Sequence, residues 1–269
     1  MRQRIDCLLI ASGKGGVGTS VVASLAALNA AERGDRVLLV DGTESGGTLH
    51  HLFGLRPTTS LWMLSASDAD PTSALIRIDD RLTLVAGGTS GAAVAPANDN
   101  ERRSALARLA HVYSDFDTII FDGGSRLDTI TAIAELADPR LLLVTSADRL
   151  SLAASYALVK SVGGKREDVR ISVVANRHGE ALAEEACDFL IGACSHFLGR
   201  RIDIAGVIPD DPCLQAAVGA GMTVRDALEG SPAADSMRGV LTRVLPSSRV
   251  PLPGPVVMSG STSSFRRWS

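Results

Sequence analysis

The chain has 269 residues, of which 45% are hydrophobic and 21% charged, a balance that excludes a mainly disordered protein. It carries 27 Lys and Arg against 30 Asp and Glu, and the resulting net charge of −3 argues against a broadly basic nucleic-acid binder. None of the four cysteines shows C-x-x-C spacing, so neither a zinc site nor a disulfide framework is expected. No apolar run approaches the roughly 20 residues that span a bilayer, which predicts a soluble, cytoplasmic protein.

Short apolar runs alternate with helical stretches along the chain. The runs expected to form strands are Cys7–Ala11, Val37–Val40, Thr118–Phe121, Leu141–Val144, Ile171–Ala175 and Ile202–Ile208. The helical stretches are residues 18–33, 100–114, 127–136, 150–163, 180–198 and 232–244. Strands that are apolar on both faces are typical of a parallel sheet covered by helices on both sides. The alternation therefore predicts an α/β fold with a doubly wound, mostly parallel sheet, and Leu82–Val85 is expected as an edge strand.

The composition changes after Leu245. Prolines follow among serines and glycines at positions 246, 251, 253 and 255, and such a segment does not propagate a helix. We therefore predict one domain over residues 1–245, ending in a helix that packs on the sheet, and a flexible tail over residues 246–269. A solvated end is expected for the last residues, Phe265-Arg-Arg-Trp268, with a weak membrane or partner anchor as the alternative.

A glycine-rich segment lies between the first expected strand and the helix that follows it. It reads Ser12-Gly13-Lys14-Gly15-Gly16-Val17-Gly18-Thr19-Ser20. Four glycines within six residues let the backbone turn tightly and direct several N–H groups at one anion. The N-terminus of the following helix adds positive potential at the same point. The spacing therefore predicts a phosphate-binding loop and not a plain turn.

The segment Lys14-Gly-Gly-Val-Gly-x-Ser20 resembles the deviant Walker A loop of the MinD/ParA ATPases. The resemblance covers about residues 4–245 in order, through Val40-Asp41, Phe116–Asp122, Val174–Arg177 and Gly206–Pro212. It implies a P-loop NTPase fold of the SIMIBI type. Within the family the chain is most similar to the flagellar-number regulators (FlhG, also called FleN). The pilus-assembly relatives CpaE and TadZ are the alternative.

The resemblance implies a role for each residue at the phosphate end of the site. Lys14 would be the signature lysine, which reaches the phosphates across an ATP-dependent homodimer. The backbone amides of Gly15 to Ser20 would cradle the phosphates, and the Ser20 hydroxyl would ligate Mg²⁺. Asp41 and Asp122, each at the end of an apolar strand, would hold the metal through water, in keeping with the oxygen ligands that Mg²⁺ prefers. Lys14, Asp41 and Asp122 are thus the catalytic candidates.

The resemblance also implies a pocket for the base. Asn176 would hydrogen-bond the adenine of ATP or ADP, while Arg177 and the turn at Pro209 would close the pocket. The expected nucleotide-binding residues are therefore Gly13, Lys14, Gly15, Gly16, Val17, Gly18, Thr19, Ser20, Asn176, Arg177 and Pro209.

Three positions depart from the family pattern. Thr19 stands where a standard P-loop has lysine, which removes a charge-assisted phosphate contact worth about 1.5–3 kcal/mol. Thr43 stands where relatives have the aspartate that positions the attacking water, and the side chain of the adjacent Glu44 is expected to point elsewhere. Arg126 stands where relatives usually have a glycine that meets the terminal phosphate. A simple surface arginine is expected there, with replacement of the missing lysine charge as the alternative.

Phosphoryl transfer depends on positioned charge and an oriented water, so these departures predict slow or absent hydrolysis. We expect a switch that binds ATP or ADP with Mg²⁺, dimerises with ATP and engages protein partners of a flagellar, pilus or other polar system. Those partners would recruit it to the inner membrane face or the cell pole. An active ATPase with a substituted cation and a scaffold that no longer binds nucleotide are the alternatives. Direct membrane binding is expected to be weak and nucleic-acid binding absent.

Overall fold

The computed structural model describes residues 5–44, 47–66, 68–89, 95–177 and 179–245. An eight-stranded sheet crosses its centre in the order β3-β4-β2-β5-β1-β6-β7-β8, and every neighbouring pair is parallel except β3 with β4. The strands are β1 (Asp6–Ala11), β2 (Val37–Asp41), β3 (Ile76–Arg77), β4 (Leu82–Val85), β5 (Thr118–Gly124), β6 (Arg140–Thr145), β7 (Ile171–Asn176) and β8 (Asp203–Ile208). The predicted doubly wound α/β fold is confirmed.

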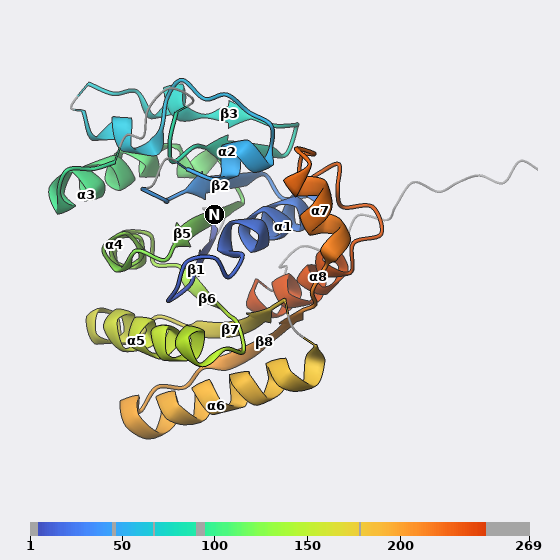
Figure 1. Cartoon of the computed structure of the whole chain (residues 1–269). Coiled ribbons are helices and arrows are strands. Elements are labelled where there is room, and N and C mark those ends of the chain that lie inside the picture. The colour runs from blue at the N-terminus through green and yellow to red at the C-terminus, as the bar shows by residue number, and fades with distance from the viewer. Residues whose placement is uncertain (1–4, 45–46, 67, 90–94, 178, 246–269) are drawn as a thin grey trace, which may run out of the picture.

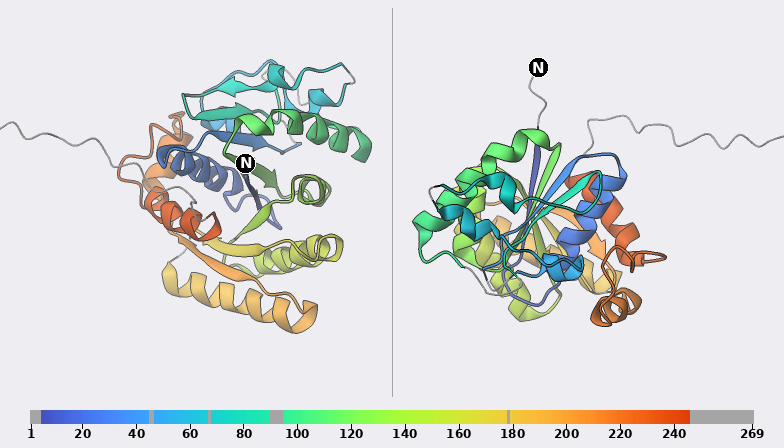
Figure 2. Two further views of the ribbon diagram at one scale, coloured as in Figure 1. Left: turned by 180° about the vertical axis from the view of Figure 1, so that it is seen from behind. Right: turned by 90° about the horizontal axis from the view of Figure 1, so that it is seen from above.

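Helices cover both faces of this sheet. They are α1 (Thr19–Glu32), α2 (Leu49–Leu52), α3 (Asp99–Leu109), α4 (Leu127–Ala137), α5 (Arg149–Lys165), α6 (Glu180–Leu198), α7 (Pro212–Gly219) and α8 (Pro232–Val244), with short 3-10 helices at Leu61–Ser65, Pro71–Ala74 and Ala110–Asp115. Figures 1 and 2 show α3, α4 and α5 on one side of the sheet and α1 and α8 on the other. Within the described residues, no helix is long and apolar enough to cross a membrane.

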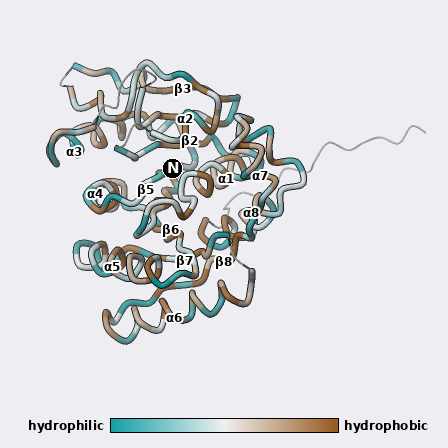
Figure 3. Tube along the Cα trace, viewed as in Figure 1, coloured by the Kyte–Doolittle hydropathy of each residue, from teal (hydrophilic) through white to brown (hydrophobic). Residues whose placement is uncertain are grey.

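The two faces of the sheet define two separate hydrophobic cores. Along β1, Leu8 and Ile10 point into the core shared with α1 and α8, whereas Leu9 and Ala11 point into the core on the opposite face. This follows from the two-residue period of a strand, which sends successive side chains to opposite sides. Figure 3 shows hydrophobic residues concentrated along the central strands and much of α1. Burial on both faces explains why the strands read as continuous apolar runs.

Three features of the fold differ from the sequence-based expectation. The strand β4, expected at the edge, lies inside the sheet because the two-residue β3 pairs with it in antiparallel orientation. The helix predicted over 100–114 is α-helical only to Leu109 and continues as a 3-10 helix to Asp115. The helix α7, which was not among the expected helical stretches, begins at Pro212, and proline is tolerated in the first turn of a helix.

The last helix packs on the sheet as predicted. Six apolar residues of α8 are buried, namely Ala233, Ala234, Met237, Val240, Leu241 and Val244. Arg140 and Arg33 donate hydrogen bonds to the carbonyls of Val244 and Leu245 at 2.8 and 2.9 Å. These contacts satisfy carbonyls at the end of the helix that have no partner within it. The predicted tail, residues 246–269, lies outside the described residues.

Buried Asp211 joins the beginnings of α7 and α8. Its Oδ1 accepts the backbone N–H of Leu214 at 2.9 Å, which caps α7. Its Oδ2 accepts the hydroxyl of Ser231 at 2.6 Å, and Ser231 itself caps α8 by accepting the N–H of Ala234. Burial alone would raise the pKa of Asp211, but the hydrogen bonds from Ser231 and the backbone outweigh it and lower the pKa. The carboxylate therefore holds two helices in their relative positions.

We predict that Asp211→Ala destabilises the protein by about 2–4 kcal/mol, because it removes a helix cap and leaves buried donors without a partner. Asp70→Ala is the matched control, since Asp70 also caps a helix that begins with proline but is exposed and holds only residues next to it. Denaturant unfolding should show a much smaller loss for the control. Equal losses would contradict a joining role for Asp211.

Candidate functional site

The register of the central strands brings the candidate residues to one edge of the sheet. Asp41 at the end of β2 pairs directly with Asp122 in β5, and β5 also pairs with β1, which leads into the glycine-rich loop. Parallel strands present their carboxyl ends at the same edge, which is where open α/β sheets bind ligands. The predicted meeting of the loop with two strand-end aspartates is therefore present.

Glycine is required in the loop for two steric reasons. A Cβ at Gly13 would lie 2.2 Å from the backbone carbon of Ala154, because the loop packs directly on α5. A Cβ at Gly18 would lie 2.4 Å from Nδ2 of Asn176, and Gly18 also adopts a left-handed φ of 90°. The loop is thus held against α5 on one side and against the end of β7 on the other.

A cavity of about 450 Å³ opens in front of the loop. One wall is the glycine-rich loop and the start of α1, and the opposite walls come from the segments after β2 and at the end of β5. The lining residues are Ser12, Gly15, Gly16, Gly18, Thr19, Ser20, Val21, Thr43, Glu44, Thr48, Gly123, Gly124, Ser125 and Arg126. The N-terminus of α1 faces this space, so the cavity suits an anion.

Thr19, which replaces the usual P-loop lysine, is only 7% exposed. Its hydroxyl donates to Oγ of Ser12 at 2.9 Å, and the Ser12 hydroxyl in turn donates to the carbonyl of Lys14 at 2.9 Å. The Thr19 side chain thereby braces the loop from within and supplies no cation to the cavity.

Lys14 does not line the cavity. Its Nζ lies 3.6 Å from Oδ1 of Asp148, the residue that caps α5. Hydrogen bonds from the side chains of Ser146 and Ser151, together with the Lys14 charge, hold the pKa of Asp148 below its usual range. Both members of the Lys14–Asp148 pair are partly exposed. In this structure Lys14 is therefore held at the rim by its own chain.

Asp41 is fully buried, and hydrogen bonds occupy both of its carboxylate oxygens. Oδ1 accepts the amide and the hydroxyl of Thr43 at 3.0 and 2.5 Å. Oδ2 accepts the amides of Thr48 and Leu49 at 2.8 and 2.9 Å. A carboxylate offers about four acceptor positions, and all four are used to fold the segment after β2. A role in holding a metal through water would require one of these bonds to be exchanged.

Asp122 differs from Asp41 because only one of its oxygens is satisfied. Oδ1 accepts the amide of Gly124 at 3.0 Å, whereas the buried Oδ2 has no partner within hydrogen-bonding geometry. Burial and the nearby charge of Asp41 raise the pKa of Asp122 well above its usual range, with a smaller opposing effect from the Ser20 hydroxyl. An unpartnered buried carboxylate oxygen beside a hydroxyl is a donor set that fits a hard divalent cation such as Mg²⁺.

Glu44 lies at the cavity wall, where its side chain is bonded to neighbouring side chains, and Arg126 is not the simple surface arginine that the sequence suggested. The Glu44 side chain is 6% exposed. It accepts hydrogen bonds from Nε of Arg102 at 2.7 Å and from the hydroxyl of Thr129. Its second oxygen lies 3.1 Å from Nε of Arg126. Burial would raise the pKa of Glu44, but these contacts outweigh it and lower the pKa. Arg126 is thus tied to a buried carboxylate at the cavity wall.

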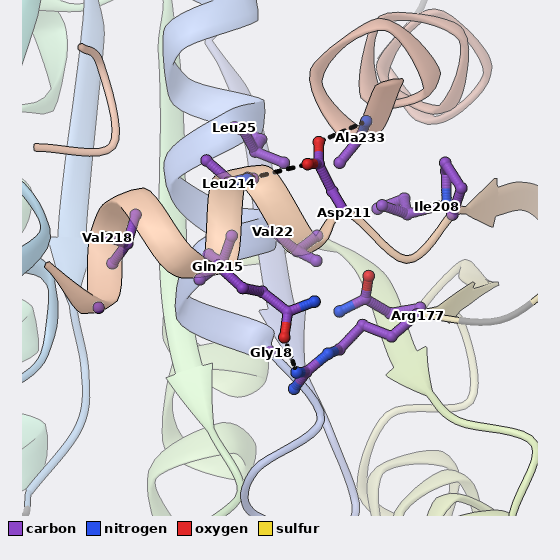
Figure 4. A pocket seen from close by; sticks show the side chains of 14 residues that line it. Gly18, Val22, Leu25, Arg177, Ile208, Asp211, Leu214, Gln215, Val218 and Ala233 are labelled. Carbon is purple, nitrogen blue, oxygen red and sulfur yellow. Dashed lines mark hydrogen bonds between the residues drawn. The ribbon is translucent and has the colours of Figure 1, made fainter. Parts of the chain in front are cut away.

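A second, mainly apolar cavity of about 280 Å³ lies between α1, α7 and α8 (Figure 4). Asn176, Arg177 and Pro209, the predicted base-pocket residues, all line it. Gly18 and Val21 line both cavities, so the two spaces meet at the start of α1. The combined space runs from the glycine-rich loop to the mainly apolar cavity, an arrangement that suits a nucleotide.

Polar side chains cluster at the mouth of the apolar cavity. Arg177, with a left-handed φ of 67°, donates to Oε1 of Gln215, as Figure 4 shows. Nε2 of Gln215 donates to Asp210 at 2.6 Å. Nδ2 of Asn176 donates to the carbonyl of Val17 at 2.8 Å, which ties the loop to β7 and leaves the amide oxygen as the group for a ligand donor.

Three residues that the sequence analysis did not single out shape this site. They are Asp148, which holds Lys14, Arg102, which neutralises Glu44, and Gln215, which contacts Arg177. Asp148 had a local signal, since an aspartate three residues before Ser151 at the start of a helix is typical of an N-cap. Arg102 and Gln215 had none, because each meets its partner only after the chain has folded.

The geometry defines a P-loop nucleotide-binding domain of the α/β class. The chain belongs to the CobQ/CobB/MinD/ParA nucleotide binding domain family, whose model matches residues 8–224. It is 26% identical to the antiactivator FleN of Pseudomonas aeruginosa over 251 residues, which are 89% of this chain and 86% of FleN.

Two further comparisons agree with this family. Identity to the flagellum site-determining protein YlxH of Helicobacter pylori is 24% over 169 residues, 63% of this chain and 57% of YlxH. The fold matches the septum site-determining protein MinD of Pyrococcus horikoshii, solved with Mg-ADP, with a TM-score of 0.71. That match has 20% identity and covers 90% of this chain and 97% of MinD.

We predict that Gly13→Ala lowers the free energy of unfolding by about 2 kcal/mol or more, because the added methyl group overlaps the backbone of α5. Gly15→Ala is the matched control, since a Cβ there meets only Oγ of Ser125, at 3.8 Å. Chemical denaturation of both variants should separate them clearly. A control as unstable as Gly13→Ala would show that glycine is needed for flexibility and not for close packing.

We also predict that Asp122→Asn stabilises the nucleotide-free protein at neutral pH and raises its Tm by about 2–4 °C. A raised pKa means that ionisation of Asp122 costs the folded state more than the unfolded state, and each pKa unit is worth about 1.4 kcal/mol. The advantage of the variant should therefore be small near pH 4 and grow as the pH rises toward neutrality.

Asp41→Asn is the control, and it should have the opposite effect. Asp41 accepts four hydrogen bonds, so the amide would place a donor against groups that are themselves donors. Thermal melts across this pH range test both variants. A lower Tm for Asp122→Asn at neutral pH would contradict the buried-charge argument.

Proposed function

We propose that this chain is a MinD/ParA-type regulatory switch that binds ATP and Mg²⁺, hydrolyses ATP slowly or not at all, and signals through nucleotide-dependent dimerisation. The observation that carries the proposal is the pair of cavities that meet at Gly18, one lined by the phosphate loop and the other by Asn176, Arg177 and Pro209. The backbone amides of Gly15 to Ser20 would hold the phosphates, and the base would enter the apolar cavity.

The metal would be held by Ser20 and Asp122. Oδ2 of Asp122 is buried without a partner, and a bound Mg²⁺ would relieve that cost as well as the repulsion from Asp41. Bound Mg²⁺ would neutralise charge on the phosphates. Ser20, at the first turn of α1, would present its hydroxyl to the metal while its amide faces the phosphates.

The side chains around the cavity are already hydrogen-bonded or ion-paired to other groups of the chain, which supports slow hydrolysis. Thr19 offers a hydroxyl bonded to Ser12, and Thr43 offers a hydroxyl bonded to Asp41. Neither can act as the cation or the water-positioning carboxylate of an active site. Glu44, the only carboxylate among the described lining residues, is committed to Arg102 and Arg126. Among the residues that the structure describes around the cavity, those suited to binding phosphates are therefore present, and none is available to orient an attacking water.

Dimerisation is supported by the surface around the loop. Leu127 and Leu150, in the first turns of α4 and α5, are exposed at the same edge of the sheet as Lys14. Two exposed leucines on the same edge of the sheet as a partly exposed lysine suit the formation of an interface with a second copy. Lys14 would have to leave Asp148 to reach a partner's nucleotide.

The similarity to FleN and YlxH favours control of the number or placement of a flagellum as the process served. Protein partners of that system would bring the switch from the cytoplasm to the membrane face or the pole. A pilus or other polar structure is the alternative process for the same switch.

We predict that calorimetric titration shows micromolar binding of ATP in the presence of Mg²⁺ by the unmodified chain. Thr19→Lys should bind ATP at least about tenfold more tightly, because it adds a charge-assisted phosphate contact. Phosphate release should be slow in both proteins, since neither has a carboxylate at position 43.

Thr19→Met is the control for the length of the new side chain without its charge, and it should not tighten binding. Binding by Thr19→Lys alone would show that the unmodified chain is a scaffold without nucleotide. Rapid turnover by the unmodified chain would show that it is an active ATPase.

A further inference from the structure

The cavity in front of the glycine-rich loop has a single cationic side chain among its described lining residues. Arg126 is the only Lys or Arg among its described lining residues. The usual P-loop cation is replaced by Thr19, and Lys14 pairs with Asp148 outside the lining. Among the described lining residues, the contact of a cationic side chain with a phosphate in this cavity therefore has to come from Arg126.

The Arg126 backbone is held close to the phosphate loop. The carbonyl of Gly124 accepts the amide of Ser12 at 2.9 Å, and the amide of Gly124 donates to Asp122 at 3.0 Å. A Cβ at Gly15 would lie 3.8 Å from Oγ of Ser125, so residue 125 lies close to the glycine-rich loop. Arg126 follows immediately, at the start of α4. Its position is thus set by the end of β5 and not by a free loop.

The Arg126 side chain forms an ion pair with Glu44 through Nε, and more than half of it is exposed. Its Nε lies 3.1 Å from Glu44, while 55% of the side chain is exposed. A guanidinium carries five N–H groups in a fixed fork, four of them on the two terminal nitrogens, and the ion pair with Glu44 is formed at Nε and not at those two nitrogens. That fork matches the oxygens of a phosphate.

The charge of Arg126 is not cancelled by its partner. Glu44 already pairs with the buried Arg102, whose guanidinium Nε lies 2.7 Å away. An alternating chain of ion pairs runs from the cavity through Arg126, Glu44, Arg102, Asp99, Arg103, Glu135 and Lys165. At the cavity end of this chain, Arg126 and Arg102 share the single carboxylate of Glu44, so one positive charge is in excess among these three groups. Arg126 is the end of the chain that borders the cavity.

We propose that Arg126 supplies the cation for the terminal phosphate of a nucleoside triphosphate, in place of the lysine missing at position 19, and that Glu44 and Arg102 position it. This inference rests on the proposed nucleotide-binding function. It assigns Arg126 to the γ-phosphate and makes the site distinguish a triphosphate from a diphosphate. Glu44 acts on the phosphate only through Arg126.

The test is calorimetric titration of the full chain with ATP and with ADP, each in the presence of Mg²⁺. Arg126→Ala should weaken ATP binding about tenfold to a hundredfold, while ADP binding changes by less than about threefold. Arg126→Lys should retain part of the preference for ATP, since it keeps the charge but loses the fork. Because the Arg126 side chain is half exposed, the variants should melt at nearly the same temperature as the unmodified chain.

Arg103→Ala is the matched control, because Arg103 belongs to the same chain of ion pairs but does not line the cavity. It should leave both affinities unchanged. An unchanged ratio of ATP to ADP affinity in Arg126→Ala would overturn the inference while leaving the proposed nucleotide switch intact. No ATP binding by the unmodified chain would overturn both.

Discussion

The parallel pairing of β5 between β2 and β1 is the constraint on which the rest of the site depends. This register sets Asp41 beside Asp122 and places the glycine-rich loop directly in front of them. Two carboxylates buried side by side repel each other, and the raised pKa of Asp122 reflects that repulsion as well as burial. The strands impose this unfavourable arrangement because their other side chains are apolar and buried on both faces of the sheet.

The two aspartates resolve this cost differently. Asp41 is satisfied internally by Thr43, Thr48 and Leu49, so it shapes the segment that follows β2. Asp122 keeps one oxygen without a partner, which makes it the more available of the two for a cation. A pair that appears equivalent in the sequence is therefore divided by its hydrogen bonds into one structural and one ligand-accessible carboxylate.

The cations around the loop also differ in their partners and positions. Lys14 is held by Asp148 at the rim, and Arg126 is held by Glu44 at the wall of the cavity. Thr19 contributes a hydroxyl that braces the loop from inside. The cationic side chain that lines the cavity therefore belongs to the segment after β5 and not to the loop. A phosphate bound in this cavity would meet backbone amides from one wall and a guanidinium from the other.

Most of the architecture could be predicted from the sequence because the signals are local. Apolar runs such as Val37–Val40 mark strands buried on both faces, and the final helix shows its apolar face directly. The position of β4 inside the sheet was missed, because the two-residue β3 that covers it is too short to carry a periodic pattern. The eight-residue helix α7 was also missed.

What the sequence by itself determined was the fold class, the phosphate loop with its missing lysine, and the residues that meet at the carboxyl edge of the sheet. Only the tertiary structure decided which of these residues have a polar group left to bind a ligand. The pairing of Glu44 with Arg102 spans 58 positions, and that of Lys14 with Asp148 spans 134. Side-chain contacts of this range depend on how strands and helices pack, and composition and spacing carry no record of them.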